Sequence, residues 1–105
     1  MTIEDIARCC QEQKLRWTGH ILERLFRRNI RLDEVVSALT NGEIIERYPA
    51  DYPFPSCLVL GVTPEGKHLH VVCGFGDTDL WLITAYIPNP AEWSADFKVR
   101  REEIP

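Results

Sequence analysis

The chain has 105 residues, of which 45% are hydrophobic and 27% are charged, and its formal net charge at pH 7 is −4. This size and balance are typical of a soluble globular protein, so we expect residues 1–105 to form a single domain. The negative charge argues against a protein that coats nucleic acid through bulk charge, so any anion-binding surface must be local. The longest apolar runs are too short to span a membrane, and the opening "MTIEDIARCC" is acidic where a signal peptide is basic. We therefore expect a cytoplasmic protein that binds no membrane.

Helical patterns fill the first part of the chain, about residues 3–40. Thr2 followed by Asp5 resembles an N-terminal helix cap and predicts a first helix over residues 3–13. Thr18 is the expected cap of a second helix, which ends near Asn29, a residue that tolerates the left-handed conformation. A third helix is expected over residues 32–39, because "TNG" follows as a helix-ending signal.

Strand patterns fill most of residues 43–88. The expected strands cover residues 43–48, 56–62, 67–75 and 80–87. Turns at "TPEG" and "GDTD" join the last three into an antiparallel meander, and the prolines of "PNPAEW" end it. The charged stretch at 94–105 is expected to be a flexible tail. The fold class is therefore α+β, with N-terminal helices packed on one face of a three- to four-stranded antiparallel sheet.

The cysteines and histidines give only weak signals for a metal site. The four cysteines lack metal-binding spacing and are interpreted as reduced, mostly buried thiols: Cys9, Cys10, Cys57 and Cys73. His20, His68 and His70 offer imidazoles, but no carboxylate stands at a diagnostic spacing from them. We expect no metal and no other cofactor.

The second expected helix carries a basic stripe. At about 100° per residue its basic residues fall within one arc of the helix, if the helical period continues as far as Arg31: His20, Arg24, Arg27, Arg28 and Arg31. The apolar residues lie on the other side and are expected to face the sheet: Ile21, Leu22, Leu25 and Phe26. His20 and Arg24 are four residues apart, so they can share one anion such as a phosphate. For Arg27, Arg28 and Arg31 the alternative is a solvated helix surface, on which the arginines pair with Glu23, Glu34 or other carboxylates.

The strands add a second group of polar side chains. If residues 67–75 pair with residues 80–87, the His70 imidazole can share a sheet face with the hydroxyl groups of Thr84 and Tyr86. The register decides this, and the sequence leaves it open. The structural alternatives are a half-buried His70 bonded to a backbone carbonyl, and a Tyr86 that packs beside Pro88 and Trp93.

These segments together resemble a bacterial family of domains of unknown function, DUF4258. The likeness rests on "HILER", "NGEIIERYPADYPFPSCLVLG", "LHVV" and "ITAYIPNPAEW", which occur in this order. That family is similar to small ribonuclease toxins of the barnase, colicin and RelE-like group, in which helices pack on an antiparallel sheet. The resemblance implies a toxin-like endoribonuclease whose partners are an RNA substrate and a cognate antitoxin. It places the family's polar motif on His20, Arg24, His70 and Tyr86.

The resulting hypothesis is RNA cleavage by metal-free acid–base chemistry, which needs a base, an acid and a cation at the phosphate. His20 and His70 would be the acid and the base in either order, because a histidine pKa lies near about 6.5. Arg24 would hold the phosphate, and Tyr86 would donate to it or orient a histidine. The residues expected to bind the substrate are Arg27, Arg28 and Thr84.

Two alternatives stay open. The first is a non-catalytic binding or regulatory module that recognises a protein or nucleic acid through the same His/Arg surface. The second is an assembly role, in which a homodimer forms through a sheet edge or through Trp17, Phe54 and Trp93.

Overall fold

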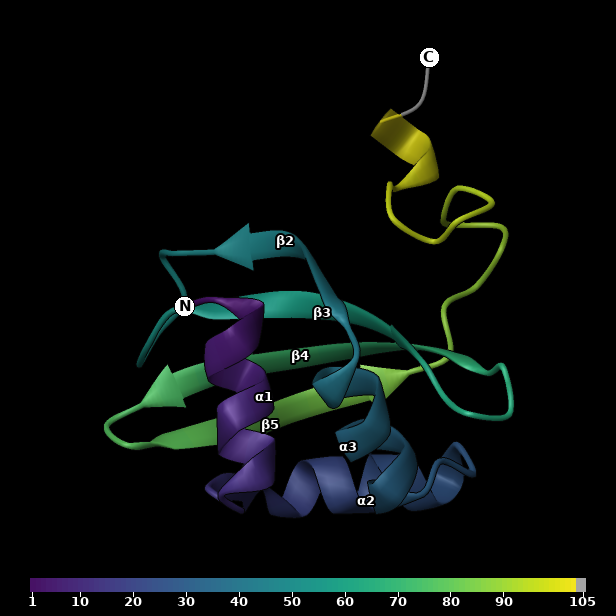
Figure 1. Ribbon diagram of the computed structural model, residues 1–105. Coiled ribbons are helices and arrows are strands. Elements are labelled where there is room, and N and C mark those ends of the chain that lie inside the picture. The colour runs from purple at the N-terminus through teal and green to yellow at the C-terminus, as the bar shows by residue number, and fades with distance from the viewer. Residues whose placement is uncertain (104–105) are drawn as a thin grey trace.

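A computed structural model of the chain describes residues 1–103, and the expected tail positions 104–105 lie outside them (Figure 1). The elements follow in the order α1 (Ile3–Gln11), β1 (Leu15–Trp17), α2 (Gly19–Arg27), α3 (Leu32–Thr40), β2 (Glu43–Tyr48), β3 (Ser56–Val62), β4 (His68–Gly76), β5 (Asp79–Tyr86) and the short 3-10 helix η1 (Arg101–Glu103). The expected α+β class is confirmed, with three α-helices preceding most of the strands.

The sheet differs from the expected one in its size and in one strand direction. It has five strands in the order β1-β5-β4-β3-β2. The meander β2–β5 is antiparallel as expected. However, β1 adds a parallel strand, with Leu15 opposite Leu80 and Trp17 opposite Leu82. The prediction of an entirely antiparallel sheet of three to four strands was therefore wrong, because a strand of three residues is too short to show alternation.

Local capping explains where the helices begin and end. The Thr2 hydroxyl accepts from the Asp5 N–H at 3.1 Å, and the Asp5 carboxylate accepts from the Thr2 N–H at 3.0 Å. The Thr18 hydroxyl likewise accepts from the Ile21 N–H at 3.2 Å. Asn29 adopts the left-handed conformation, with φ 57°. Gln13 shares that φ, so α1 ends earlier than residue 13.

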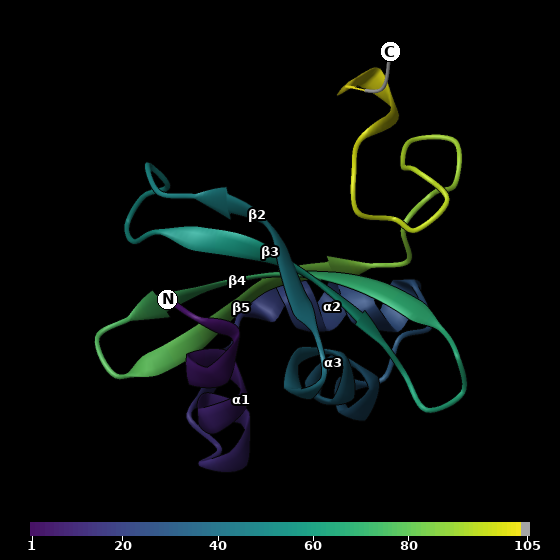
Figure 2. The same ribbon diagram turned by 45° about the horizontal axis from the view of Figure 1, so that its top comes forward.

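The helices pack on one side of the sheet, and the core lies between the two layers (Figure 2). Alternate β4 residues face this core, namely Leu69, Val71 and Cys73. From α2, only Ile21 and Leu25 are buried, at 0% and 2% exposure.

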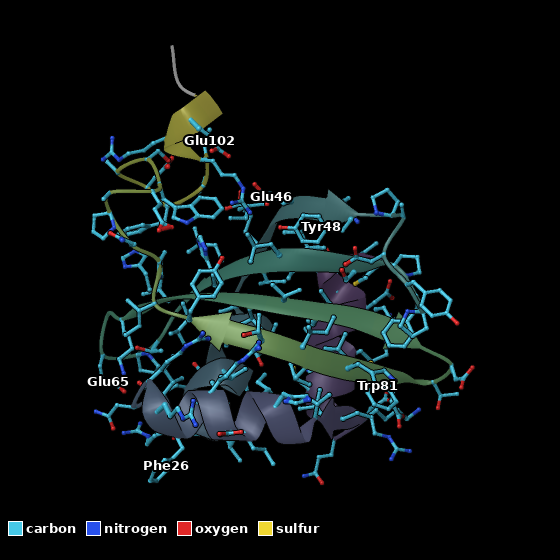
Figure 3. The ribbon with its side chains drawn as sticks, turned by 180° about the vertical axis from the view of Figure 1, so that it is seen from behind. Phe26, Glu46, Tyr48, Glu65, Trp81 and Glu102 are labelled. Atoms are coloured by element: carbon cyan, nitrogen blue, oxygen red, sulfur yellow. The ribbon has the colours of Figure 1, made fainter. Side chains whose placement is uncertain are left out.

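Two apolar residues of α2 do not face the sheet as expected. Leu22 is 44% exposed and Phe26 is 88% exposed, and Phe26 points away from the sheet in Figure 3. The expectation was wrong because α2 lies along β5 near the border of the sheet, so only a narrow strip of the helix makes contact.

Residues 88–103 lie on the other side of the sheet, which none of the α-helices α1, α2 and α3 covers (Figure 2). We call residues 88–103 the cover segment. We call the side of the sheet opposite the three α-helices the helix-free face. A β-bridge between Trp93 and Arg100 holds the cover segment in a loop. It includes the stretch expected to be a flexible tail from residue 94, which makes specific contacts as far as Arg101.

Two further features concern the whole described chain. The four cysteines are free, and Cys9, Cys57 and Cys73 are buried. Across residues 1–103, no helix has both the length and the apolar character needed to cross a bilayer.

Candidate functional site

His70 and Tyr86 meet on the helix-free face. They are direct partners in the register of β4 and β5, so their side chains emerge side by side from the same face. The His70 Nδ1 atom lies 3.2 Å from the Tyr86 hydroxyl oxygen. The two rings meet edge to face, with centroids 5.3 Å apart. The register that the sequence left open therefore brings two of the expected site residues into contact.

The hydrogen bonds of His70 determine its tautomer. Its Nε2 atom lies 2.9 Å from the backbone carbonyl oxygen of Phe97. A carbonyl only accepts, so Nε2 carries the hydrogen. In the neutral ring Nδ1 is then bare and accepts from the Tyr86 hydroxyl. Burial lowers the pKa of His70, although the Phe97 carbonyl and Glu46 act in the opposite direction, and the ring is neutral at pH 7.

The cover segment closes over His70. The Trp93 ring stands edge to face against the imidazole, with centroids 4.4 Å apart. His70 is 0% exposed and Trp93 is 3% exposed. Tyr86 is less covered and stays half-buried, and this burial raises the pKa of its hydroxyl. The structure therefore leaves Tyr86, rather than His70, within reach of solvent.

An ion pair ties the cover segment to β2. The Arg100 guanidinium donates to both oxygens of Glu46, at 2.9 and 3.1 Å, and it also lies 4.7 Å above the Trp93 ring. Burial alone would raise the pKa of Glu46, but hydrogen bonds from Arg100 and Tyr48 outweigh it and hold that pKa below its usual value. Figure 3 shows Glu46 beside the cover segment.

Arg28 and Thr84, two of the expected substrate-binding residues, are in contact. The Arg28 Nη1 atom lies 3.3 Å from the Thr84 hydroxyl and donates to the Ala85 carbonyl at 2.7 Å. Arg28 therefore reaches around β5 from the helix side to the helix-free face. It is also close enough to Tyr86 for its charge to favour the ionised phenol.

The other α2 cations stand apart from that contact. His20 and Arg24 are exposed, and neither side chain has a hydrogen-bond or ion-pair partner within residues 1–103. Arg27 is exposed and is bound by Glu23 at 2.6 Å. His20 precedes Arg28 by about 12 Å of helix. The structure thus joins His70 to Tyr86 and Arg28 to Thr84, while His20 and Arg24 form the free part of the basic stripe.

The described residues form no cluster of three or more His, Cys, Asp or Glu side chains that could hold a metal ion. His68, one of the three imidazoles considered for such a site, instead packs against Phe97, with ring centroids 5.0 Å apart.

Residues 17–87 match the model of the family described as Domain of unknown function (DUF4258). The chain belongs to this family. Within the DUF4258 match lie β2–β5, α2, α3 and all four positions of the polar motif, His20, Arg24, His70 and Tyr86. The cover segment and α1 lie outside it. No curated protein and no solved structure matches the chain.

Sequence reasoning missed the residues that close the site. Trp93 was considered only as a packing neighbour of Tyr86, and its contact with the His70 ring was not predicted. Phe97, Arg100 and Glu46 carried no expected role at all. A β-bulge between Ile44 and Glu46 turns Glu46 to the helix-free face, whereas Ile44 packs against the core. The path of the cover segment then brings Arg100 to Glu46.

Proposed function

We propose that this protein is a toxin-like endoribonuclease that cleaves RNA by metal-free proton transfer at Tyr86. The observation that carries the proposal is the Tyr86–His70 hydrogen bond, 3.2 Å long, beside the Arg28–Thr84 contact. A phenol oxygen whose proton is donated inward keeps its lone pairs free to accept from a substrate hydroxyl. A neighbouring guanidinium suits the charge that grows on a phosphate during cleavage.

The proposed reaction proceeds through a proton relay. The ribose 2′-hydroxyl passes its proton to the Tyr86 oxygen, while Tyr86 passes its own proton to Nδ1 of His70. The 2′-oxygen forms a bond to phosphorus as the bond to the 5′-oxygen breaks, and water protonates that leaving oxygen. The products are a 2′,3′-cyclic phosphate and a 5′-hydroxyl. His70 then returns the proton on Nδ1 to the Tyr86 oxygen, while the Tyr86 hydroxyl releases the proton taken from the ribose to solvent, and the starting tautomer is restored.

This proposal changes two roles expected from the sequence. His70 acts through Tyr86, so His70 is a positioning and proton-accepting residue. His20 joins Arg24 as a side chain that binds a phosphate farther along the RNA through a ring N–H, because it lies about 12 Å along α2 from the Arg28–Thr84 contact. The exposure of both side chains supports this role.

The second candidate function is a non-catalytic module that binds RNA or protein through the same surface. The observation that favours it is the burial of His70, which is 0% exposed and has both ring nitrogens occupied. A histidine that only fixes Tyr86 and the cover segment needs no contact with a substrate.

Cleavage of a labelled RNA distinguishes the two candidates. We would incubate the purified protein with a 5′-labelled, mixed-sequence single-stranded RNA, with and without translating ribosomes, and analyse the product ends. Tyr86→Phe keeps the ring and removes the hydroxyl, so cleavage should fall by about 10²- to 10⁴-fold. The control is Phe26→Ala, because Phe26 is 88% exposed on α2 and lies outside the proposed relay.

Equal cleavage by wild type and Tyr86→Phe would remove Tyr86 from the mechanism. Binding of the RNA without cleavage in either condition would favour the module. A wild-type protein that neither binds nor cleaves RNA would overturn both RNA-directed candidates.

The proposal extends to partners and to fold kinship. We propose a RelE- or barnase-like ancestry for the α+β fold, and a cognate antitoxin that blocks the protein. A homodimer is also proposed. The outer strand β2 supports it, because an edge strand presents unpaired backbone groups to a second strand. Buried Trp93, at 3% exposure, is already used within the chain. The molar mass in solution tests the dimer.

A further inference from the structure

An aromatic groove opens on the helix-free face, away from the cover segment. It has a volume of about 450 Å³, and its lining includes Thr18, Tyr52, Phe54, Trp81 and Ile83. Tyr52 is 95% exposed, and Figure 3 shows Trp81 far from Glu46 and the cover segment. The proposed function assigns no role to this groove.

Two glycines of β4 create the floor of the groove. A Cβ atom on Gly74 would meet the Phe54 ring at 3.0 Å, and one on Gly76 would meet Phe54 at 2.6 Å and Trp81 at 2.7 Å. The missing side chains therefore let both aromatic rings lie close against the sheet. Phe54 and Trp81 pack together, with centroids 6.0 Å apart. The groove thus has a packed aromatic floor.

The groove itself offers flat apolar rings, and the cations that could bind an anionic backbone lie beside it on α2. The Arg16 guanidinium lies 6.0 Å over the Trp81 ring and is paired with Asp79 at 2.5 Å. Asp51, the acidic residue of the lining, is hydrogen-bonded to Ser56. A hydroxyl does not neutralise the Asp51 carboxylate, so the positive charge for an RNA backbone comes from Arg24 of the α2 stripe, which is exposed and has no ion-pair partner within residues 1–103.

The α2 stripe connects the groove to Tyr86. Thr18, the cap of α2, lines the groove beside Trp81 and Ile83, whereas Arg28 after α2 contacts Thr84. Helix and strand therefore run alongside each other in the same direction, from the groove toward Tyr86. Arg24, one helical turn before Arg28, lies on the same side of α2.

We propose that this groove is a nucleobase-binding subsite for single-stranded RNA, a proposal that rests on the proposed function. A base stacks on the faces of Tyr52 and Trp81, while the RNA backbone follows His20 and Arg24 toward Tyr86. Exposed aromatic faces beside a cationic track are the combination by which proteins bind single strands with little sequence preference.

The test uses a fluorescein-labelled octamer of 2′-O-methyl uridine, which lacks the attacking hydroxyl and so reports binding alone. Its dissociation constant is measured by anisotropy at one fixed salt concentration. Tyr52→Ala and Trp81→Ala should each weaken binding by about 5- to 150-fold, which corresponds to about 1–3 kcal/mol of stacking per base. Tyr52→Ala changes an exposed side chain and should preserve the fold. It therefore tests the groove even if Trp81→Ala fails to fold.

Two controls separate stacking from charge and from general loss of an aromatic residue. Phe26→Ala removes another exposed aromatic side chain, 88% exposed on α2, and should bind like wild type. An abasic octamer of the same length offers the backbone alone, so wild type and the groove variants should bind it equally.

The outcomes distinguish the subsite from the function. Cleavage by wild type, together with wild-type octamer binding by both groove variants, would overturn the subsite and leave the proposed function standing. Groove-dependent binding without any cleavage would support the subsite and count against the enzyme. The subsite would also be overturned if the groove variants weakened binding of the abasic octamer as much as binding of the uridine octamer, because base stacking would then play no part.

Discussion

The Nε2 atom of His70 donates to the Phe97 carbonyl at 2.9 Å, which joins a strand in the centre of the sheet to the cover segment. This bond places the imidazole hydrogen on Nε2 and leaves Nδ1 to accept from Tyr86. Phe97 lies outside the residues that match the family, whereas His70 and Tyr86 lie within them. A segment outside the family match thus sets the protonation geometry of a pair that lies within it.

The stability of the protein should fall as the pH decreases from 7.5 to 5.5. His70 is buried and its pKa is lowered in the folded state, so the unfolded chain binds a proton at His70 below about pH 6.5 while the folded chain does not. The contribution of neutral His70 to the free energy of unfolding is therefore fully present above about pH 6.5 and is lost as the pH falls below it. Urea unfolding at several pH values measures the slope.

His70→Gln is the matched variant for this pH dependence, because it keeps a side-chain donor and cannot titrate. Its slope between pH 7.5 and 5.5 should be smaller than that of wild type. Glu46, Arg100, His68 and Tyr86 also act on His70. An unchanged slope would show that His70 is not the group that takes up the proton.

Glu46→Gln should loosen the cover segment. Glu46 and Arg100 form a two-bond ion pair, with side-chain exposures of 20% and 39%. Because Arg100 is partly solvated, the expected loss is only about 1 kcal/mol of unfolding free energy. Hydrogen exchange of the cover segment should rise.

Glu43→Gln provides the control on the same strand, since Glu43 also joins β2 to the cover segment, through Lys98 at 3.1 Å. The side chains of Glu43 and Lys98 are both largely exposed. The free energy of unfolding of Glu43→Gln should therefore stay within about 0.5 kcal/mol of the wild-type value. Equal effects of the two variants would contradict a special role for the Glu46–Arg100 pair.

Arg24→Ala should reduce RNA cleavage and leave stability unchanged to within about 0.5 kcal/mol, because the side chain is exposed. A charged hydrogen bond to phosphate contributes about 1.5–3 kcal/mol, so cleavage should fall by about 10- to 150-fold. Arg8→Ala on α1, which removes an exposed arginine outside the stripe, should cleave like wild type. A similar loss in both variants would indicate a general charge effect.

Gly61→Ala should destabilise the fold by about 1–3 kcal/mol. A Cβ atom at this position would lie 2.2 Å from the Ala38 carbonyl oxygen, so α3 would have to move away from β3. Gly19→Ala is the opposite case, because nothing lies within 4 Å of its Cβ position, and it should stabilise by about 0.4–1 kcal/mol. Thermal unfolding of both variants measures the difference. A neutral Gly61→Ala would mean that α3 and β3 can separate at little cost.

Much of the fold follows from local patterns. Thr2 and Thr18 cap their helices through hydrogen bonds to residues three positions on, and such contacts depend on the neighbouring sequence alone. The four longer strands lie within one residue of their expected positions at each end. Strand β1 was missed because its three residues are defined by pairing with β5, a contact across more than sixty positions of the chain.

The candidate site, too, could be predicted from the sequence only in part. The residue types at His20, Arg24, His70 and Tyr86, and the helix or strand that carries each, can be derived from the sequence. Their grouping depends on the register of β4 with β5 and on the course of the cover segment. Trp93, Phe97 and Arg100 reach His70 and Glu46 only through that course.

The sequence by itself determined the helix caps, the four long strands and a basic edge on α2, because hydrogen bonds and hydrophobic periodicity act between near neighbours. The tertiary structure alone decided that His70 bonds to Tyr86 beneath Trp93, and that an aromatic groove stays open at the other end of β5. Those outcomes depend on side chains brought together from distant segments, where pairing register and competition for buried space select one arrangement among many.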